Sequence, residues 1–362
     1  MQILTPHMSA LAESLAKRGC KVTFVSNMIL SPNRSKQGWE KPSLSKTSFK
    51  LVTNKKATHR LAMSAPNNSI HLCQGLRGNG LVKSAQNIIK KRGLSHWVLM
   101  EAIDDAGLIG IFKKFVYHFL FFQWRNHLSG VLAIGQNSSE WFIKRGMVKD
   151  RIYPFAYFLE NPKKYISKKS FEDQISNRPF RFIFVGRLIK LKKLDLLINA
   201  IEALNIKDIE LWIVGNGPEK YKLKQLAQKS LPTKVKWLGT MPITKIPEVL
   251  SDADCLVLPS RYDGWGAVIS EALMVGTPVI CSDNCGAANV VTASNVGSVF
   301  STNDFDSLVR SLKSQLKKGK CGGKVRKKIS DWSKCLDSES GAEYLKLIMQ
   351  KRNNIIPPWL KK

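Results

Sequence analysis

Residues 255–282 read CLVLPSRYDGWGAVISEALMVGTPVICS and carry the clearest fold signal in the sequence. The apolar run 255–258 predicts a buried strand, a helix is expected over 267–275, and 278–281 is a second apolar strand. Nearly all-apolar strands separated by helices are typical of a parallel sheet that is covered on both faces. Open sheets of this kind bind ligands at the carboxyl ends of their strands, so the glycine-containing loop 259–266 is a candidate site.

The same alternation of strands and helices extends through the whole chain, which favours an α/β fold with two Rossmann-like halves. In the second half, further strands are predicted at 180–185, 209–214, 235–238 and 297–300, with helices at 194–204, 219–229, 244–250 and 338–351. In the first half, strands are predicted at 21–26, 69–73, 96–101 and 130–135, with helices at 7–17, 81–91, 107–126 and 138–145.

Length and composition limit the class of protein. The chain has 362 residues, and its 44% hydrophobic content excludes an intrinsically disordered protein. We expect two domains and a linker near 160–178: an N-terminal domain at 1–162, a C-terminal domain at 163–340, and a helix and tail at 341–362 that pack back on the N-terminal domain. The first strand is short or truncated, because only residues 2–4 precede Thr5-Pro6-His7.

Other sequence signals exclude several kinds of protein. The seven cysteines are scattered, which is typical of free thiols in a reducing compartment. Cys281 and Cys285 lack the two further ligands that a zinc site needs, so no metal is expected. There is no apolar run of about 18 residues to span a membrane and no secretory signal at the start, so we expect a cytoplasmic protein.

Two carboxylates stand out in the segment quoted above. Asp263 lies in the loop, and Glu271 follows eight residues later, about two helical turns along. The N–H groups of Gly264, Trp265 and Gly266 suit an anion or a sugar hydroxyl at the start of the helix. Two simpler interpretations stay open: Asp263 as a helix N-cap, and Glu271 as a complement to the helix dipole.

This segment resembles the Glu-x7-Glu motif of the retaining glycosyltransferases of family 4, with Asp263 in place of the first Glu. Three further segments resemble the family in order and spacing: Val185–Leu188 with Lys192, Val214–Pro218, and Val235–Gly239. Lys193 stands where the family usually has glycine. The resemblance covers roughly residues 180–300 well and the first half of the chain only loosely.

The resemblance implies a GT-B fold, in which two Rossmann-like domains with parallel sheets face a central cleft. It also implies transfer of a sugar from a nucleotide diphosphate donor of the UDP or GDP type, with retention and without a cofactor or metal. Arg187 and Lys192 would bind the diphosphate, Glu271 the ribose and Asp263 the sugar. The other implied donor contacts are Gly186, Gly215, Asn216, Trp237, Leu238, Gly264, Trp265 and Gly266.

The first half offers candidates for the acceptor side. Glu101, Asp104 and Asp105 lie at the end of a predicted strand, where Glu101 and Asp104 could orient an acceptor hydroxyl as catalytic groups and Asp105 could bind the acceptor. His7 lies in the expected first strand-to-helix loop and is a further candidate for acceptor binding. The alternatives are a capped helix start for the three acids and an ordinary loop histidine for His7.

The charge of the chain suggests an anionic partner. The 57 Lys+Arg against 27 Asp+Glu give a formal charge of +30, which suits an anionic membrane, nucleic acid, an anionic substrate or simple solubility. Residues 112–125, FKKFVYHFLFFQWR, combine aromatic and basic side chains. This helix either packs in the core or dips into a membrane interface, and the second alternative predicts a peripheral protein on the inner face of the membrane.

The expected function is therefore transfer of a sugar to a polysaccharide or a lipid-linked glycan of the cell envelope. A Rossmann-type nucleotide-binding protein without transferase activity is the main alternative. A dinucleotide-dependent oxidoreductase is disfavoured, because Gly215-Asn216-Gly217 is followed by Lys220 where the third glycine would stand. A nucleic-acid-binding protein would explain the charge, but no module signature accompanies it, and no specific nucleic-acid partner is expected.

Overall fold

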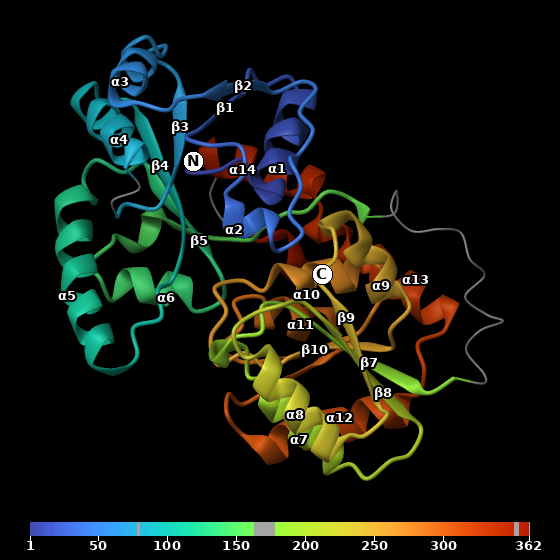
Figure 1. Ribbon diagram of the computed structural model, residues 1–362. Helices are drawn as coiled ribbons and strands as arrows, with labels where there is room; N and C mark the ends of the chain where they lie inside the picture. Colours follow the sequence, from blue (N-terminus) through green and yellow to red (C-terminus); the bar gives the residue numbers. More distant parts are fainter. Residues whose placement is uncertain (78–79, 163–177, 351–354, 362) are drawn as a thin grey trace. The chain divides into compact units, whose positions relative to one another are not determined.

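The computed structural model describes residues 1–77, 80–162, 178–350 and 355–361 (Figure 1). The chain divides into two compact units: unit 1 is Met1–Ser31, Lys41–Phe158 and Gly341–Pro357, and unit 2 is Pro32–Glu40, Leu159–Ser340 and Pro358–Lys362. The expected linker at 160–178 lies mostly outside the described residues.

Unit 2 is built on a six-stranded parallel sheet whose order is β12-β11-β10-β7-β8-β9. Numbered from its first strand, this is the order 3-2-1-4-5-6 of a doubly wound nucleotide-binding fold. The strands are β7 (Phe180–Val185), β8 (Ile209–Val214), β9 (Val235–Gly239), β10 (Cys255–Leu258), β11 (Val279–Ser282) and β12 (Ser298–Phe300).

Helices cover both faces of this sheet, which explains why its strands are apolar on both sides. Packing contacts join α7, α8 and α12 in one layer, and α9, α10 and α13 in the other (Figure 1). The helices of unit 2 are α2 (Pro32–Ser35), α7 (Leu194–Glu202), α8 (Lys220–Ser230), α9 (Ile246–Ser251), α10 (Ala267–Met274), α11 (Ala288–Ser294), α12 (Phe305–Lys318) and α13 (Gly323–Trp332).

Unit 1 has a four-stranded parallel sheet, in the order β3-β4-β5-β6, and a separate parallel pair, β1-β2. The strands are β1 (Thr23–Ser26), β2 (Ser48–Leu51), β3 (Ile70–Gln74), β4 (Ser95–Glu101), β5 (Gly130–Ile134) and β6 (Ile152–Phe155). The helices are α1 (Pro6–Lys17), α3 (Lys55–Met63), α4 (Leu81–Lys91), α5 (Gly107–Trp124), α6 (Ser138–Ile143) and α14 (Ser338–Met349), which begins in unit 2.

The first residues of unit 1 form less than a full strand. Ile3 makes a single parallel bridge with Met28, and Leu4 is buried. At the other end of the chain, α14 packs against β6: the Tyr344 hydroxyl donates to the Pro154 carbonyl at 2.8 Å, and the rings of Tyr344 and Phe155 stack. The edge strand β6 is therefore supported by a helix from the far end of the sequence.

The segment Pro32–Glu40 belongs to unit 2, although it lies early in the sequence. The Ile243 N–H donates to the Gly38 carbonyl at 2.8 Å. A Cβ on Gly38 would lie 1.9 Å from the Met241 carbonyl oxygen, so this close approach requires glycine.

Candidate donor site

The candidate site of unit 2 lies where the strand order reverses. The chain proceeds from β7 to β8 and β9 on one side of the sheet, and then returns to β10, β11 and β12 on the other side. At such a point the two neighbouring loops diverge and leave a crevice beyond the carboxyl ends of the strands. The loops that follow β7 and β10 contain Lys192 and Asp263, and they meet here.

Two contacts join these loops. The Arg261 N–H donates to the Leu191 carbonyl at 2.9 Å, and the Lys192 ammonium group forms an ion pair with the Asp263 carboxylate. Each side chain of the ion pair is only 17% exposed, so water screens the attraction less than at an open surface. The predicted diphosphate-binding cation and the predicted sugar-binding carboxylate are thus direct partners.

The loop that carries Asp263 is fixed by contacts with its neighbours. The Asp263 N–H donates to the Asn284 carbonyl at 3.1 Å, and the Gly286 N–H donates to the Asp263 carbonyl at 2.8 Å. A Cβ on Gly286 would lie 1.9 Å from the Gly264 carbonyl oxygen, so the two backbones could not approach so closely with any other residue. These contacts hold Asp263 in place beside Lys192.

The side chain of Trp265 packs in the core and is unavailable to a ligand, so only its backbone N–H, the group named in the sequence-based prediction, is left for donor binding. It is 1% exposed, its indole N–H donates to the Ser270 hydroxyl at 3.2 Å, and its ring lies 6.3 Å from that of Trp359. Gly266 precedes α10 with a φ of 82°, a left-handed conformation that favours glycine. At this point in the loop only backbone groups are left to meet a substrate.

Glu271 is the fifth residue of α10 and is half-buried. Burial raises the pKa of its carboxyl to about 7, because the charged form loses hydration. A ligand that donates hydrogen bonds to this carboxyl group would stabilise its charged form. Hydroxyl groups of a ribose are donors of that type.

The ends of β7, β8 and β9 form one continuous backbone edge. The Gly215 N–H donates to the Gly239 carbonyl at 2.7 Å, and the Leu188 N–H donates to the Asn216 carbonyl at 3.0 Å. Gly215 has a φ of 135°, and a Cβ there would lie 1.9 Å from the Gly186 carbonyl oxygen. Gly186 and Gly215 therefore allow two strand ends to touch.

Arg187 and Asn216 are exposed on this edge, and both are accessible to a ligand. Trp237 and Leu238 lie in β9 and are half-buried. The Lys224 ammonium group lies 5.8 Å from the centre of the Trp237 ring, where the negative ring face attracts a cation. The positions of these four residues at or beside the carboxyl edge are compatible with the expected donor contacts.

The candidates of unit 1 have different surroundings. Glu101 is the last residue of β4 and is half-buried. The Asp104 carboxylate accepts a long hydrogen bond of 3.4 Å from the Ala106 N–H. Asp105 forms an ion pair with Arg145 and accepts a hydrogen bond of 3.0 Å from the Trp141 indole.

His7 is the second residue of α1, in agreement with the predicted helix at 7–17, so it lies just after the strand-to-helix loop in which it was also placed. Its ring stacks on Tyr157, with 5.2 Å between the ring centres. Thr5, two residues earlier, caps the helix by accepting the Met8 N–H. The histidine therefore already packs against an aromatic ring of unit 1.

No cluster of three or more His, Cys, Asp or Glu side chains that could hold a metal ion occurs within residues 1–77, 80–162, 178–350 and 355–361. Cys281 and Cys285, the pair that the sequence singled out, are both fully buried. The Cys285 thiol donates to the Leu258 carbonyl at 3.6 Å. Both cysteines are part of the packing of the β10 and β11 strands.

Comparisons with known proteins find similar sequences, several of which are named glycosyltransferases. Residues 166–333, just under half of the chain, match the family described as glycosyl transferases group 1. An uncharacterised 41.2 kDa protein in the cps region of Klebsiella pneumoniae is 25% identical over 147 residues, which cover 41% of this chain and 40% of that protein. An uncharacterised glycosyltransferase of Methanocaldococcus jannaschii is 24% identical over 288 residues, 70% of this chain and 76% of that one.

Two solved structures share the fold over almost the whole chain. Anabaena HepE, solved in complex with UDP, has a TM-score of 0.74 at 14% identity, over 97% of this chain and 100% of that one. WaaG, a glycosyltransferase involved in lipopolysaccharide biosynthesis, has a TM-score of 0.60 at 16% identity, over 96% and 98%. The predicted GT-B fold is confirmed, and the family match with the named relatives supports a glycosyltransferase enzyme.

Proposed function

We propose that the chain transfers a sugar from a nucleotide diphosphate sugar to a polysaccharide or lipid-linked glycan, with retention of anomeric configuration. The ion pair between Lys192 and Asp263, where the strand order reverses, is the observation on which the proposal rests. The HepE complexes with UDP and with UDP-glucose support a donor of this class. The chain spans 40% and 29% of the length of the first two curated relatives that it matches. The identities of the donor and of the acceptor are therefore part of this proposal.

The proposed reaction breaks the bond between the anomeric carbon and the donor diphosphate, and forms a bond from that carbon to an acceptor hydroxyl. Negative charge grows on the departing diphosphate, and Lys192 with the exposed Arg187 would stabilise it. Asp263 would then be released from Lys192 to accept hydrogen bonds from the sugar hydroxyls. The acceptor proton leaves with the diphosphate or with a carboxylate, for which Glu101 and Asp104 stay candidates.

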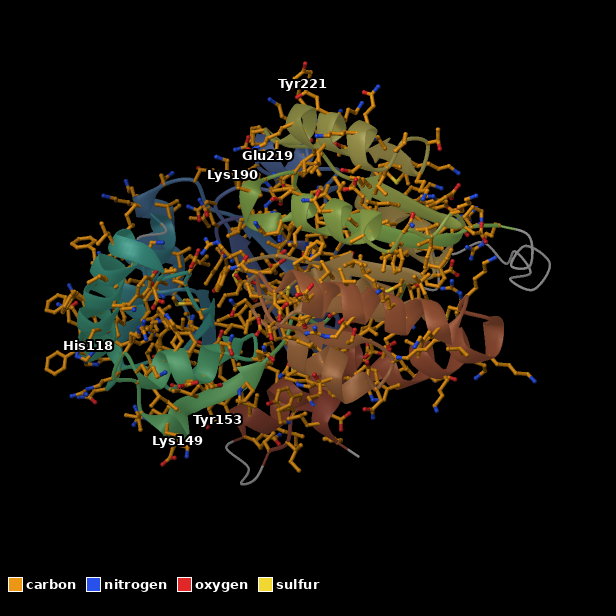
Figure 2. All side chains as sticks on the ribbon, turned by 90° about the horizontal axis from the view of Figure 1, so that it is seen from below. His118, Lys149, Tyr153, Lys190, Glu219 and Tyr221 are labelled. Atoms are coloured by element: carbon orange, nitrogen blue, oxygen red, sulfur yellow. The ribbon has the colours of Figure 1, made fainter. Side chains whose placement is uncertain are left out.

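A panel of UDP and GDP sugars, followed by thermal unfolding and by product analysis, tests this proposal. A bound donor at 100 times its Kd should stabilise unit 2 by about 2.7 kcal/mol. Lys192→Met and Arg187→Met should each weaken donor binding about tenfold, since a charge-assisted hydrogen bond is worth roughly 1.5–3 kcal/mol. Lys190→Met is the matched control, because Lys190 is an exposed cation of the same loop without a proposed role (Figure 2).

Three outcomes separate the proposal from its alternatives. Turnover that persists in EDTA fits a site in which Lys192 and Arg187 stabilise the departing diphosphate without a metal ion. Loss of turnover in EDTA would contradict such a site. Donor binding without any transfer would favour the non-catalytic nucleotide-binding protein. An inverted product would overturn the retaining mechanism.

We also propose that the enzyme works at an anionic membrane surface, with α5 as the contact. The outer face of α5 is apolar and exposed, at Leu108 (86%), Phe112 (66%), Phe115 (72%), Phe119 (60%) and Phe122 (58%). Figure 2 shows side chains projecting outward from this helix around His118. An apolar face of this size on a basic protein suits a helix that lies in the interface of an anionic membrane.

The inner face of the same helix packs in unit 1, so core packing accounts for that face, and the membrane contact is proposed only for the outer face. Tyr117, Phe121 and Trp124 are buried and pack with Trp141 and Phe142 of α6. No helix of the described chain is long and apolar enough to span a membrane. The proposed mode of binding is therefore peripheral.

The double variant Phe115→Ser/Phe119→Ser tests this location. It should abolish sedimentation with vesicles of phosphatidylcholine and phosphatidylglycerol, and it should leave folding intact because both rings are exposed. High salt should release much of the wild-type protein, since salt screens attraction to the head groups. Equal binding of the wild type and the double variant would contradict a role for α5.

A further inference from the structure

An open surface pocket of about 460 Å³, called the cavity below, lies in unit 1 beside α5. It is lined by residues from α5, from α6 and from the loops at their ends: Asp105, Lys114, Asn137, Glu140, Trp141, Lys144 and Arg145. Its volume falls in the range of small-molecule sites. We infer that this cavity binds the phosphate group of an anionic lipid head when α5 lies in the membrane interface.

The charges of the cavity favour an anion. Three of the lining residues are cations and two are carboxylates, and each carboxylate has a cationic partner within the cavity. Asp105 is held by Arg145 and by the Trp141 indole, and Glu140 pairs with Lys144 at 2.5 Å. This leaves Lys114 as an exposed cation with no carboxylate partner among the described side chains.

Two further polar groups of the cavity have unused hydrogen-bonding capacity. Asn137 precedes α6 at the N-cap position, where an asparagine normally accepts a backbone N–H, but its side chain makes no capping bond. Arg145 is 7% exposed, its guanidinium lies 4.6 Å from the centre of the Trp141 ring, and its Nε is buried without a partner. A buried donor without a partner is costly, and the residue that carries this donor lines the cavity.

The position of the cavity on α5 matches the depth of lipid phosphates. Successive residues of a helix are about 100° apart, so Lys114 lies on the flank of α5 next to Phe115. When the apolar face of a helix enters the acyl boundary, its flanks lie at the level of the head groups. Lys113, the neighbouring cation, instead donates to the Asp104 carbonyl at 2.9 Å, which leaves Lys114 on the cavity side.

This inference rests on the proposed membrane contact of α5, and vesicle binding of the full chain tests both separately. Lys114→Gln should reduce affinity for phosphatidylglycerol vesicles about fivefold or more, and Lys83→Gln, an exposed cation outside the cavity, by less than twofold. Asn137→Ala changes no charge and should reduce the same affinity about threefold. Asn126→Ala, an exposed asparagine after α5, is its control and should change nothing.

A soluble probe identifies the phosphate group as the feature that is bound. Glycerol phosphate should shift the indole N–H resonance of Trp141 and should compete with phosphatidylglycerol vesicles for the wild type, but not for Lys114→Gln. Equal losses for Lys114→Gln and Lys83→Gln, or no effect of Asn137→Ala, would show diffuse charge attraction and would overturn the subsite. If only Phe115→Ser/Phe119→Ser loses vesicle binding, the membrane contact of α5 is supported and the phosphate subsite is refuted. If the wild type does not bind vesicles, both the membrane contact and the subsite are refuted. Neither outcome bears on the proposed binding of the sugar donor.

Discussion

At the scale of single residues, Asp263 and Glu271 have different surroundings, and we expect their substitutions to separate sugar transfer from nucleotide binding. Asp263→Asn removes the partner of Lys192, which is then free for the diphosphate. Binding of the free nucleoside diphosphate should stay equal or become tighter, while turnover with the full donor should fall tenfold or more. Calorimetry with UDP or GDP, beside turnover with the matching sugar donor, measures both.

Glu271→Gln should have the opposite effect. The substitution keeps the shape of the side chain but removes the charge that ribose hydroxyls would meet, so nucleotide binding should weaken even without the sugar. Because the pKa of Glu271 is raised to about 7, wild-type affinity for the nucleoside diphosphate should improve as pH rises through 7, and the variant should lack this trend. Equal loss of nucleotide binding in both variants would refute this division of roles.

The sequence predicted Asp263 and Glu271 as candidate site residues, but it did not predict the ion pair that Asp263 forms. Spacing placed Asp263 in a loop and Glu271 in a helix, and both placements are correct. The pairing of Asp263 with Lys192 depends on β7 and β10 being neighbours, and those strands are some 70 residues apart in the chain. The burial of Trp265 has the same origin, because its partner Trp359 comes from the end of the chain.

At the scale of elements, the predicted helices and strands agree best with the structure where the local hydrophobic pattern is strong. The predicted bounds of β7, β8, β10 and α4 match the structure, since each is a continuous apolar run or a strongly periodic helix. The prediction missed β2, β6, α2, α3, α11, α12 and α13. β2 is largely exposed and has little apolar signal, and its strand conformation comes from pairing with β1.

The close contact of two strand-end loops gives a prediction at this scale. Gly215→Ala would place a Cβ against the Gly186 carbonyl, so we expect a loss of at least about 2 kcal/mol in stability and weaker donor binding. Gly322→Ala is the control, because a Cβ there meets nothing within 4 Å and its φ is −76°. Chemical denaturation and donor titration of both variants provide the comparison, and a stable Gly215→Ala with normal donor binding would contradict the close approach.

At the scale of the whole molecule, each unit has its own core, and burial shifts the pKa of an imidazole in unit 1 and of a carboxyl in unit 2 in ways that act in opposite pH directions. In unit 1, burial lowers the pKa of His96 from 6.5 to about 4, and neither ring nitrogen has a hydrogen-bond partner among the described residues. In unit 2, burial raises the pKa of Glu271 from 4.5 to about 7. Each group therefore changes its proton occupancy when its unit unfolds.

The signs follow from which state binds the proton. Unfolded His96 binds a proton that the folded state excludes, so unit 1 should lose up to about 3 kcal/mol as pH falls from 6.5 to 4. Folded Glu271 holds a proton that the unfolded state releases, so unit 2 should lose up to a similar amount, about 3 kcal/mol, as pH rises from 4.5 to 7. Calorimetric scans across this range should show two transitions whose separation changes with pH.

Two variants assign these transitions. His96→Leu removes the titrating group from unit 1, so the difference in Tm between this variant and the wild type should grow as pH falls below 6.5 and affect one transition only. Glu271→Gln should change the other transition, with the largest gain relative to the wild type above pH 7, where the buried carboxylate of the wild type is charged. Donor should raise the Tm of the transition assigned by Glu271→Gln and leave the other one in place, because the proposed donor contacts lie in unit 2. A single transition whose Tm both variants shift alike would show that the two units unfold together. If donor raises only the Tm of the transition assigned by His96→Leu, the nucleotide binds to unit 1, which would contradict the donor site proposed in unit 2.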